Sequence, residues 1–384
     1  MIRRNFKKGI TCTLNELLLF VGMFFCLASR MFICVDGISG YLDLFGAISS
    51  ISLLLSIAVS FRKISIKTIV CIMLIVAFYA TSIILIKNNY LSQALLFAMA
   101  AREIRFEKVI KVDLIAKLLF MGIVVAMYYL GYTNTATNIL GGKGTELSYG
   151  FNNLNQLAAY ILGIYLDILY LLWKTATHKK IILSLGFLLV VALVTGSRSV
   201  EFTILAALVL SIIPFSRLKK KRGVAIILSG LFWFFMVISL LLTVNIESPF
   251  VRDINKILSG RMSLQHAFLE EYGISAFGNH FIKYGTVRNT SSAYFVLDSA
   301  YMQLLIRFGL VASIVFGYLY GKRVKDGVLR SEYNKVAGLV SFMFFGLMET
   351  GLFYAHQNPF LMTLLNGRNI KEKDSEKGIY HEKK

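Results

Sequence analysis

Arg198 places a full positive charge between two long apolar runs. The segment LVTGSRSVEFTIL (193–205) joins the runs 181–194 and 202–215. An arginine at mid-depth in a bilayer costs roughly 2.5–3.5 kcal/mol and usually faces a polar cavity. Its planar, permanently charged fork suits bidentate binding of phosphate. We therefore expect Arg198 to contact an anionic ligand, and an ion pair with Glu201, three residues along, is the competing interpretation.

Further side chains that suit the same chemistry follow later in the chain. Arg261, Arg288 and His280 lie in the segment 245–296, which is far longer than an ordinary connection and is therefore expected to be functional. Asp298 comes directly after it, in VLDSAYMQLLIRFGL. Arginines can stabilise the charge that develops on a leaving phosphate without a metal. A carboxylate beside them can act as the general base on a hydroxyl. The residues predict an anionic, lipid-linked ligand.

Two more polar residues interrupt apolar surroundings. Glu349 lies within the run 334–354, and a lone buried carboxylate is costly, so we expect it to face a ligand. Asn155 begins the run 154–173. Simpler interpretations remain open at this stage: Asp298 could be the N-cap of the helix that follows it, and the loop arginines could be ordinary solvated charges.

Several common enzyme signatures are absent from the sequence. It contains no phosphate-cradling glycine loop, no HExxH, no CxxC and no nucleophile elbow, which argues against a cytoplasmic nucleotide enzyme. We expect no cofactor and no metal. The cysteines show no paired spacing, so no disulfide is expected either. They are Cys12, Cys26, Cys34 and Cys71.

The elements that must position these residues are membrane-spanning helices. The 384-residue chain is 57% hydrophobic and 16% charged, with a mean hydropathy of +0.67, a composition that a soluble domain does not have. Apolar stretches near the length of about 20 residues that crosses a bilayer recur throughout. We predict an all-α polytopic bundle of about 10 to 12 transmembrane helices. The candidate spans are 14–35, 41–60, 64–86, 89–101, 112–131, 154–173, 180–196, 199–216, 223–244, 297–320, 334–354 and 357–366.

The basic residues predict how these spans are oriented. The net charge is +20, but Lys and Arg occur in short clusters between apolar runs, which argues against nucleic-acid binding. If the N-terminus is cytoplasmic and the spans alternate, most of the 41 Lys and Arg fall on the inner side, where they face anionic lipid. This predicts a multi-pass plasma-membrane protein with both termini in the cytoplasm. The outer-side cations are then Arg30, Lys87, Lys143, Arg198, Arg252, Lys256, Arg261, Lys283, Arg288 and Arg307.

The predicted organisation is one polytopic membrane domain, 1–366, followed by a basic cytoplasmic tail, 367–384. The outer loop 245–296 lies within the domain and contains GRMSLQHAFLEEYG, which predicts a short helix ending at Gly273. The segment 101–117 pairs opposite charges at i,i+4 spacing. It is interpreted as an interfacial helix that leads into a span, or equally as a solvated extension of that span.

Five motifs occur in a characteristic order over about 150–366. They are GFNNLNQLA, TGSRS, LSGRMSLQHAFLEEYGISAFGNH, LDSAYMQLLIRFGLVASIV and METGLFYAHQNPFLMTLL. This order resembles the O-antigen polymerase and ligase superfamily, and looks most like the Wzy-type repeat-unit polymerases of capsule and exopolysaccharide clusters in Gram-positive bacteria.

The resemblance implies metal-independent glycosyl transfer on the outer face of the membrane. A growing glycan would leave its undecaprenyl pyrophosphate carrier and pass to a sugar hydroxyl on a fresh lipid-linked repeat unit. Arg198 and Arg261 match family arginines and would hold the donor pyrophosphate. Asp298 stands where related ligases carry His, and would serve as the general base. Tyr301, Gly309, Glu349 and Asn358 also match family positions. The expected substrate-binding residues are Arg288, His280, Glu349, Asn155 and Tyr301.

The resemblance also implies partners and leaves alternatives. The expected partners are the lipid-linked oligosaccharide, membrane lipid, a flippase and a chain-length regulator. A ligase that moves finished glycan to another acceptor is one alternative, although its expected His is replaced by Asp298. A transporter or flippase for lipid-linked sugars is another, and it predicts mid-membrane charges and internal repeats, of which the sequence gives no sign. A non-enzymatic membrane scaffold is the remaining possibility.

Overall fold

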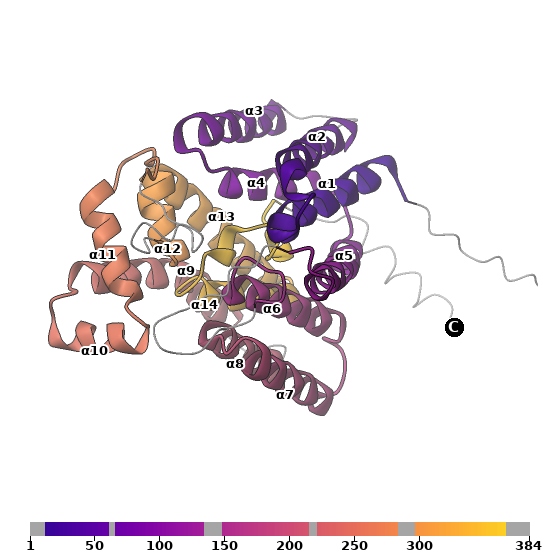
Figure 1. Ribbon diagram of the computed structural model, residues 1–384. Helices are drawn as coiled ribbons and strands as arrows, with labels where there is room; N and C mark the ends of the chain where they lie inside the picture. The colour runs from indigo at the N-terminus through magenta and orange to yellow at the C-terminus, as the bar shows by residue number, and fades with distance from the viewer. Residues whose placement is uncertain (1–11, 61–65, 134–147, 215–220, 283–295, 366–384) are drawn as a thin grey trace, which may run out of the picture.

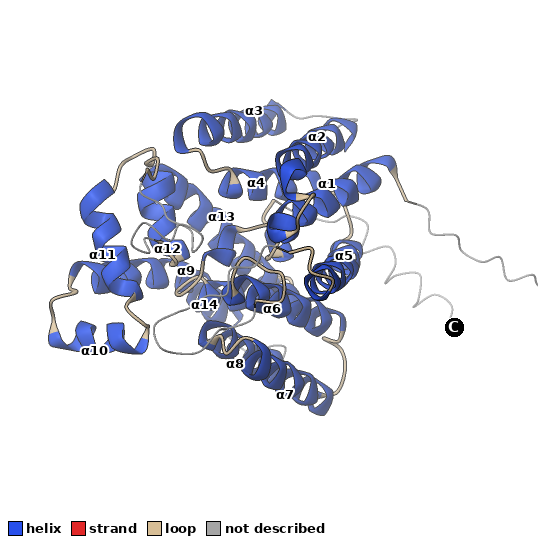
Figure 2. Ribbon diagram, viewed as in Figure 1, coloured by secondary structure: helices blue, strands red, loops and turns tan. Residues whose placement is uncertain are grey.

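The computed structural model describes residues 12–60, 66–133, 148–214, 221–282 and 296–365, and its named elements in these ranges are all helical (Figures 1 and 2). Seven helical segments of this part of the chain are long and apolar enough to cross a membrane. This confirms the predicted all-α, multi-pass membrane bundle. The seven segments are Leu14–Cys34, Ser39–Ser60, Ile69–Ile86, Leu154–Leu171, Thr177–Val194, Lys221–Val244 and Ala300–Leu329.

The α-helices follow the predicted apolar runs closely in the first two thirds of the chain. In the N-terminal half they are α1 (Leu14–Met31), α2 (Leu42–Ser60), α3 (Ile66–Thr81), α4 (Tyr90–Ala100), α5 (Phe106–Tyr129) and α6 (Leu154–Leu171). The later helices are α7 (Thr177–Val194), α8 (Arg198–Ile212), α9 (Lys221–Val244), α10 (Pro249–Ile257), α11 (Arg261–Tyr272), α12 (Ala300–Gln303), α13 (Gly309–Leu329) and α14 (Tyr333–Phe345).

Helices at the centre of the bundle are buried, whereas helices at its surface expose many apolar side chains. Almost every residue of α4 and α14 is buried, so these helices are covered by others on all sides. Outer helices instead present apolar stripes outward. On α7 such a stripe follows helical spacing, with 57–76% of each residue exposed at Ile182, Leu185, Leu189 and Leu193. A stripe of this kind is what a lipid-facing helix requires, because lipid tails solvate apolar side chains.

The last two predicted spans are corrected by the structure. The run 334–354 was expected to be one helix, but α14 ends at Phe345. The run 357–366 forms only a 3-10 helix, Pro359–Thr363, whose five residues are buried. Between them the backbone is irregular apart from the 3-10 turn Thr350–Phe353. Pro359, the first residue of this 3-10 helix, has no backbone N–H and cannot donate a helical hydrogen bond. Irregular backbone is tolerated at membrane depth only where protein covers it.

The segment 101–117 is not a helix of its own but an extension of the helix that follows it, one of the two interpretations, and it is exposed only in part. From Phe106 onward it is the first part of α5, which continues into the span. The Glu107–Lys111 pair is exposed and its Nζ–Oε1 distance is 2.5 Å. Asp113 and Lys117 also form an ion pair, but both side chains are buried.

The segment 245–296 contains α10 and α11, and its described part packs back onto the bundle. The structure confirms that a helix ends at Gly273, whose φ is +64°. Beyond it, Asn279 N donates to Arg307 O at 2.9 Å and Leu310 N donates to Ser275 O at 3.0 Å. Gly278 and Gly309 both have φ near +90°, and a side chain on either would collide with the backbone of the other segment. This close approach fixes the loop, and with it α11, against the start of α13.

Candidate functional site

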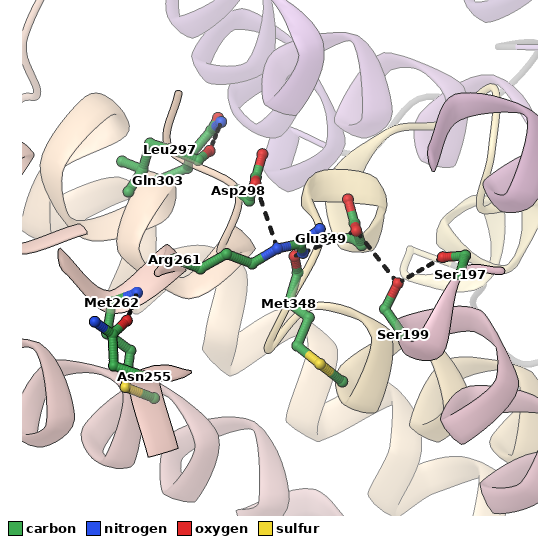
Figure 3. A network of polar contacts seen from close by, with 10 residues as sticks. All are labelled: Ser197, Ser199, Asn255, Arg261, Met262, Leu297, Asp298, Gln303, Met348 and Glu349. Carbon is green, nitrogen blue, oxygen red and sulfur yellow. Dashed lines mark hydrogen bonds and ion pairs between the residues drawn. The ribbon is translucent and has the colours of Figure 1, made fainter. Parts of the chain in front are cut away.

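Arg261 lies between two carboxylates that come from distant parts of the chain (Figure 3). Its Nη1 is 2.8 Å from Glu349 Oε1, and its Nε is 3.6 Å from Asp298 Oδ2. It also donates a hydrogen bond to the carbonyl of Met348. The three charged side chains are 12–20% exposed, so the cluster is largely enclosed but still reaches the surface. The structure therefore brings together three of the residues singled out in the sequence.

The position of Arg261 is set by the turn between α10 and α11. Gly260 precedes it with a φ of +80°, a conformation that glycine adopts without the steric cost of a side chain. Asn255 Oδ1 accepts a hydrogen bond from Met262 N at 2.9 Å, which satisfies one of the free donors at the start of α11 (Figure 3). Arg261 is the first residue of α11 and so projects from an anchored helix end.

Asp298 is placed two residues before α12, outside the helix. The N-cap of α12 is Ser299, whose hydroxyl accepts from Met302 N at 3.5 Å. The N-cap interpretation of Asp298 is therefore wrong, and its carboxylate is left to face Arg261. Gln303 Nε2 donates to Leu297 O at 2.7 Å and holds the backbone on the other side of Asp298 (Figure 3).

Glu349 is held in the irregular segment that follows α14. Its backbone N donates to Phe345 O at 3.0 Å. Ser199 Oγ donates to Glu349 Oε1 at 3.2 Å, from the side opposite Asp298, and is itself 3.1 Å from Ser197 Oγ (Figure 3). Ser199 was not among the predicted site residues. The TGSRS motif was the available signal, because a residue adjacent to Arg198 on the first turn of α8 must lie near the same end of the bundle.

Burial raises the proton affinity of both carboxylates. It raises the pKa of Glu349 to about 7, with Arg261 opposing the shift and the nearby Asp298 charge adding to it. Burial likewise raises the pKa of Asp298 above its ordinary value, and again Arg261 opposes it. A carboxylate with a raised pKa is a stronger base than a solvated one, and for Glu349 the raised pKa lies near neutral pH.

Arg198 is exposed and is the first residue of α8. Within the described part of the chain it makes no hydrogen bond or ion pair. The competing ion pair with Glu201 is therefore not formed. Arg198 directly precedes Ser199, which contacts Glu349, so its free guanidinium belongs to the same end of the bundle as the carboxylate cluster.

The remaining predicted residues are not joined to this cluster. Tyr301 is fully buried and its hydroxyl donates to Met343 O at 2.9 Å, which makes it a packing contact between α12 and α14. Asn155 is half-buried on the first turn of α6. His280 is exposed. Arg288 lies outside the described residues.

A second charged cluster lies away from this site, and the sequence predicted only one of its two ion pairs. Lys117 lies between Asp113, with which it forms an ion pair, and Asp167 Oδ2, at 3.3 Å, and all three side chains are buried. Lys117 Nζ also donates to Gln357 O at 3.3 Å. The i,i+4 spacing of the first two residues was visible in the sequence. The third member was indicated only by Asp167 itself, a lone carboxylate inside the apolar run 154–173.

Neither protein-family models, nor curated proteins, nor solved structures gave a match to this chain. No three His, Cys, Asp or Glu side chains lie close enough to hold a metal ion in the described ranges. The site is thus defined by its own geometry. Two carboxylates of raised pKa surround one guanidinium, and Arg198 nearby is exposed and has no acceptor among the described residues.

Proposed function

We propose that the chain is a membrane glycosyltransferase that polymerises undecaprenyl-pyrophosphate-linked oligosaccharide repeat units into a surface polysaccharide, without a metal, on the outer membrane face. The observation that carries the proposal is the convergence of Arg261, Asp298 and Glu349. These residues were selected from the sequence by their chemistry and by a family resemblance, and nothing in their spacing required them to meet.

The proposed reaction assigns the base to Asp298. Its carboxylate accepts the proton of a sugar hydroxyl on the incoming repeat unit, and the hydroxyl oxygen attacks the anomeric carbon of the growing glycan. The bond from that carbon to the pyrophosphate oxygen breaks, and undecaprenyl pyrophosphate leaves with the electron pair. The raised pKa of Asp298 supports this role, since burial makes its carboxylate a stronger base than a solvated one.

The two arginines have different proposed roles. Arg198 is exposed with free donors, so it is the better candidate to bind the leaving pyrophosphate, whose charge grows as the bond breaks. The resemblance gave Arg261 the same role. In this structure its charge is already offset by Asp298 and Glu349, so we assign it to orienting the two carboxylates. Ser199 supports Glu349 from the other side.

The proposed setting is the plasma membrane with both termini in the cytoplasm. A flippase would deliver the lipid-linked substrate, and a chain-length regulator would limit the product. A site at the end of a bundle of membrane-spanning helices suits a substrate whose carrier is a long apolar chain, because the carrier can stay in lipid while the sugars reach the site.

The decisive test uses purified full-length protein in proteoliposomes with a lipid-linked repeat unit, followed by gel separation of the glycans. A ladder of increasing length, persisting in EDTA, supports the proposal. Arg198→Ala should remove the ladder, and Arg252→Ala is the matched control because Arg252 is an exposed arginine paired with Glu247 outside the cluster. A full ladder from Arg198→Ala would contradict the donor-binding role.

One observation favours a second candidate, a transporter for lipid-linked sugars. That alternative predicts charges buried within the membrane, and Lys117, Asp113 and Asp167 are charges buried inside the helical bundle. Buried ionisable residues in membrane helices often belong to transport paths. The same vesicles separate the two functions, since movement of the lipid-linked unit across the bilayer without ladder formation supports transport instead of polymerisation.

A further inference from the structure

A cavity of about 820 Å³ lies beside the N-terminal helices, away from the Arg261 cluster. It is lined by α1, α2, the end of the α3 segment and the turn before α4. Its polar lining includes Arg30, Lys87, Asn88 and Asn89. Arg30 and Lys87 are two of the cations that the charge distribution predicts for the outer side, and the proposed reaction uses neither of them. The volume is within the range of about 300–1,000 Å³ typical of ligand sites.

Arg30 lines this cavity with its charge uncompensated. In the parts of the chain that the structure describes, its guanidinium makes no hydrogen bond or ion pair, and its Nε is a buried atom without a partner. Buried polar atoms are nearly always paired, and a desolvated cation without an acceptor is costly. A guanidinium that lines a cavity and has no acceptor among the described residues indicates that an anion completes the site.

The guanidinium is nevertheless held in place. Its Cζ lies 4.4 Å from the centroid of the Tyr90 ring, a cation–π contact. The Tyr90 ring packs on Tyr354 with centroids 4.2 Å apart, and His356 stacks on Tyr354 at 5.3 Å. Gln156 Nε2 donates to the Arg30 carbonyl at 3.1 Å. A preorganised arginine loses little freedom on binding, which favours affinity.

A second cation stands at the rim. Lys87 is exposed and has a φ of +51°, a left-handed conformation that is uncommon for a residue with a side chain. The structure gives it no ion pair within the described ranges. Asp43 also lines the cavity, and no ion pair joins it to Arg30 or Lys87. The charged lining is therefore two cations and one carboxylate, which leaves a net positive site.

One wall of the cavity is apolar and faces outward. Ile51 on α2 and Ile83 at the end of the α3 segment line it, and they are 57% and 46% exposed. Both residues belong to segments that are long and apolar enough to span the membrane. A ligand that occupies this cavity can thus place an anionic group on Arg30 and an alkyl chain along the two isoleucines.

We propose that this cavity binds a lipid through its phosphate. Arg30 contacts the phosphate oxygens as a bidentate fork, Lys87 adds a second charge at the rim, and Asn88 and Asn89 supply neutral hydrogen-bonding groups. The lipid tail lies against Ile51 and Ile83. A phosphodiester membrane lipid and a polyprenyl phosphate share this chemistry. The proposal does not rest on the polymerase function, because it concerns binding at a separate cluster.

The test measures lipid binding to the purified full-length protein in detergent and phosphate-free buffer, by native mass spectrometry and by thermal shift. The probes are phosphatidylglycerol, a polyprenyl phosphate, inorganic phosphate and diacylglycerol, which has no phosphate. We expect both phosphate lipids to bind saturably and to raise the unfolding temperature, while diacylglycerol does not. Stronger binding of one phosphate lipid identifies the tail, and stabilisation by inorganic phosphate equal to that by the lipids overturns the lipid assignment.

Variants locate the site. Arg30→Gln should weaken binding of the phosphate lipids at least about tenfold, since it removes a charge-assisted bidentate contact. Lys87→Gln, at an exposed position where folding is not at risk, should weaken it less but measurably. Arg252→Gln is the matched control and should bind as the wild type does. Unchanged binding in both Arg30→Gln and Lys87→Gln overturns the proposal, whatever the outcome of the glycan ladder assay.

Discussion

Arg261 Nη1 and Glu349 Oε1 lie 2.8 Å apart, although one residue begins α11 and the other follows α14. Asp298 joins the same guanidinium at 3.6 Å. The contact therefore joins three segments at one end of the bundle, and a single cation compensates two enclosed carboxylates. The stability of the site, the pKa values of its carboxylates and its proposed chemistry all depend on this pairing of one cation with two carboxylates.

Removing the cation should destabilise the protein unless a carboxylate is removed as well. Arg261→Gln leaves Asp298 and Glu349 facing each other without compensation, and breaking an enclosed pair in this way costs about 3 kcal/mol. The double variant Arg261→Gln/Glu349→Gln should recover most of the loss. Thermal unfolding in detergent measures both. Arg252→Gln is the control and should cost less than about 1 kcal/mol, because its pair with Glu247 is exposed. Additive losses in the double variant would contradict the pairing.

The raised pKa of Glu349 predicts the direction of a pH effect on stability. The ordinary pKa of this carboxyl is 4.5 and its folded value is about 7, so the folded state binds more protons between these values. The contribution of Glu349 to folding stability therefore declines as the pH rises from 4.5 to about 7. Unfolding temperatures of Glu349→Gln should fall less over this window than those of the wild type. The exposed Asp253→Asn serves as control, and parallel curves for all three proteins would rule out the shift.

Arg198→Ala should remove activity without affecting folding. Arg198 is exposed and unpartnered within the described ranges, so its loss leaves the unfolding temperature unchanged. Loss of a group that stabilises a developing oxyanion typically reduces the rate by about 10²–10³-fold. The initial rate of ladder formation in proteoliposomes measures this effect. A drop in unfolding temperature that matches the drop in rate would instead indicate a structural role.

The buried triad around Lys117 should be sensitive to unbalanced charge. Lys117→Met leaves Asp113 and Asp167 buried without a cation and should cost about 3–5 kcal/mol. Replacing all three residues together, as Lys117→Met/Asp113→Asn/Asp167→Asn, should restore most of the stability. If the triad has only a structural role, the triple variant keeps full ladder formation and any transport activity. Loss of lipid transport in a stable triple variant would favour the transporter alternative.

Sequence patterns predicted the helices well because bilayer crossing requires long apolar runs, and such runs are local. They failed where tertiary packing decides the backbone. The run 334–354 is apolar enough for a helix, yet α14 ends at Phe345, and Glu349 in the irregular segment that follows contacts Arg261. The run 357–366 contains a short 3-10 helix that is buried in the protein. A buried turn and a membrane helix both require apolar residues, so composition alone does not distinguish them.

The candidate site was predictable in its residue types but not in its pairings. An arginine or carboxylate in an apolar run is costly, and this identified Arg198 and Glu349. Arg261 and Asp298 were identified from the long segment 245–296 and from the family resemblance. Which of them meet depends on contacts between distant segments, and no spacing rule predicts those contacts. Local sequence is also ambiguous at the start of α12. Either Asp298 or Ser299 could cap this helix, and in the structure Ser299 does.

The most direct measurement of the central claim is ladder formation by Asp298→Asn in proteoliposomes with a lipid-linked repeat unit. Asparagine keeps the size of the side chain but cannot accept the proton of the acceptor hydroxyl at neutral pH. We expect the variant to insert, to unfold near the wild-type temperature and to form no ladder, while Asp253→Asn forms a normal one. A normal ladder from Asp298→Asn would show that this carboxylate is not the base and would contradict the proposed reaction.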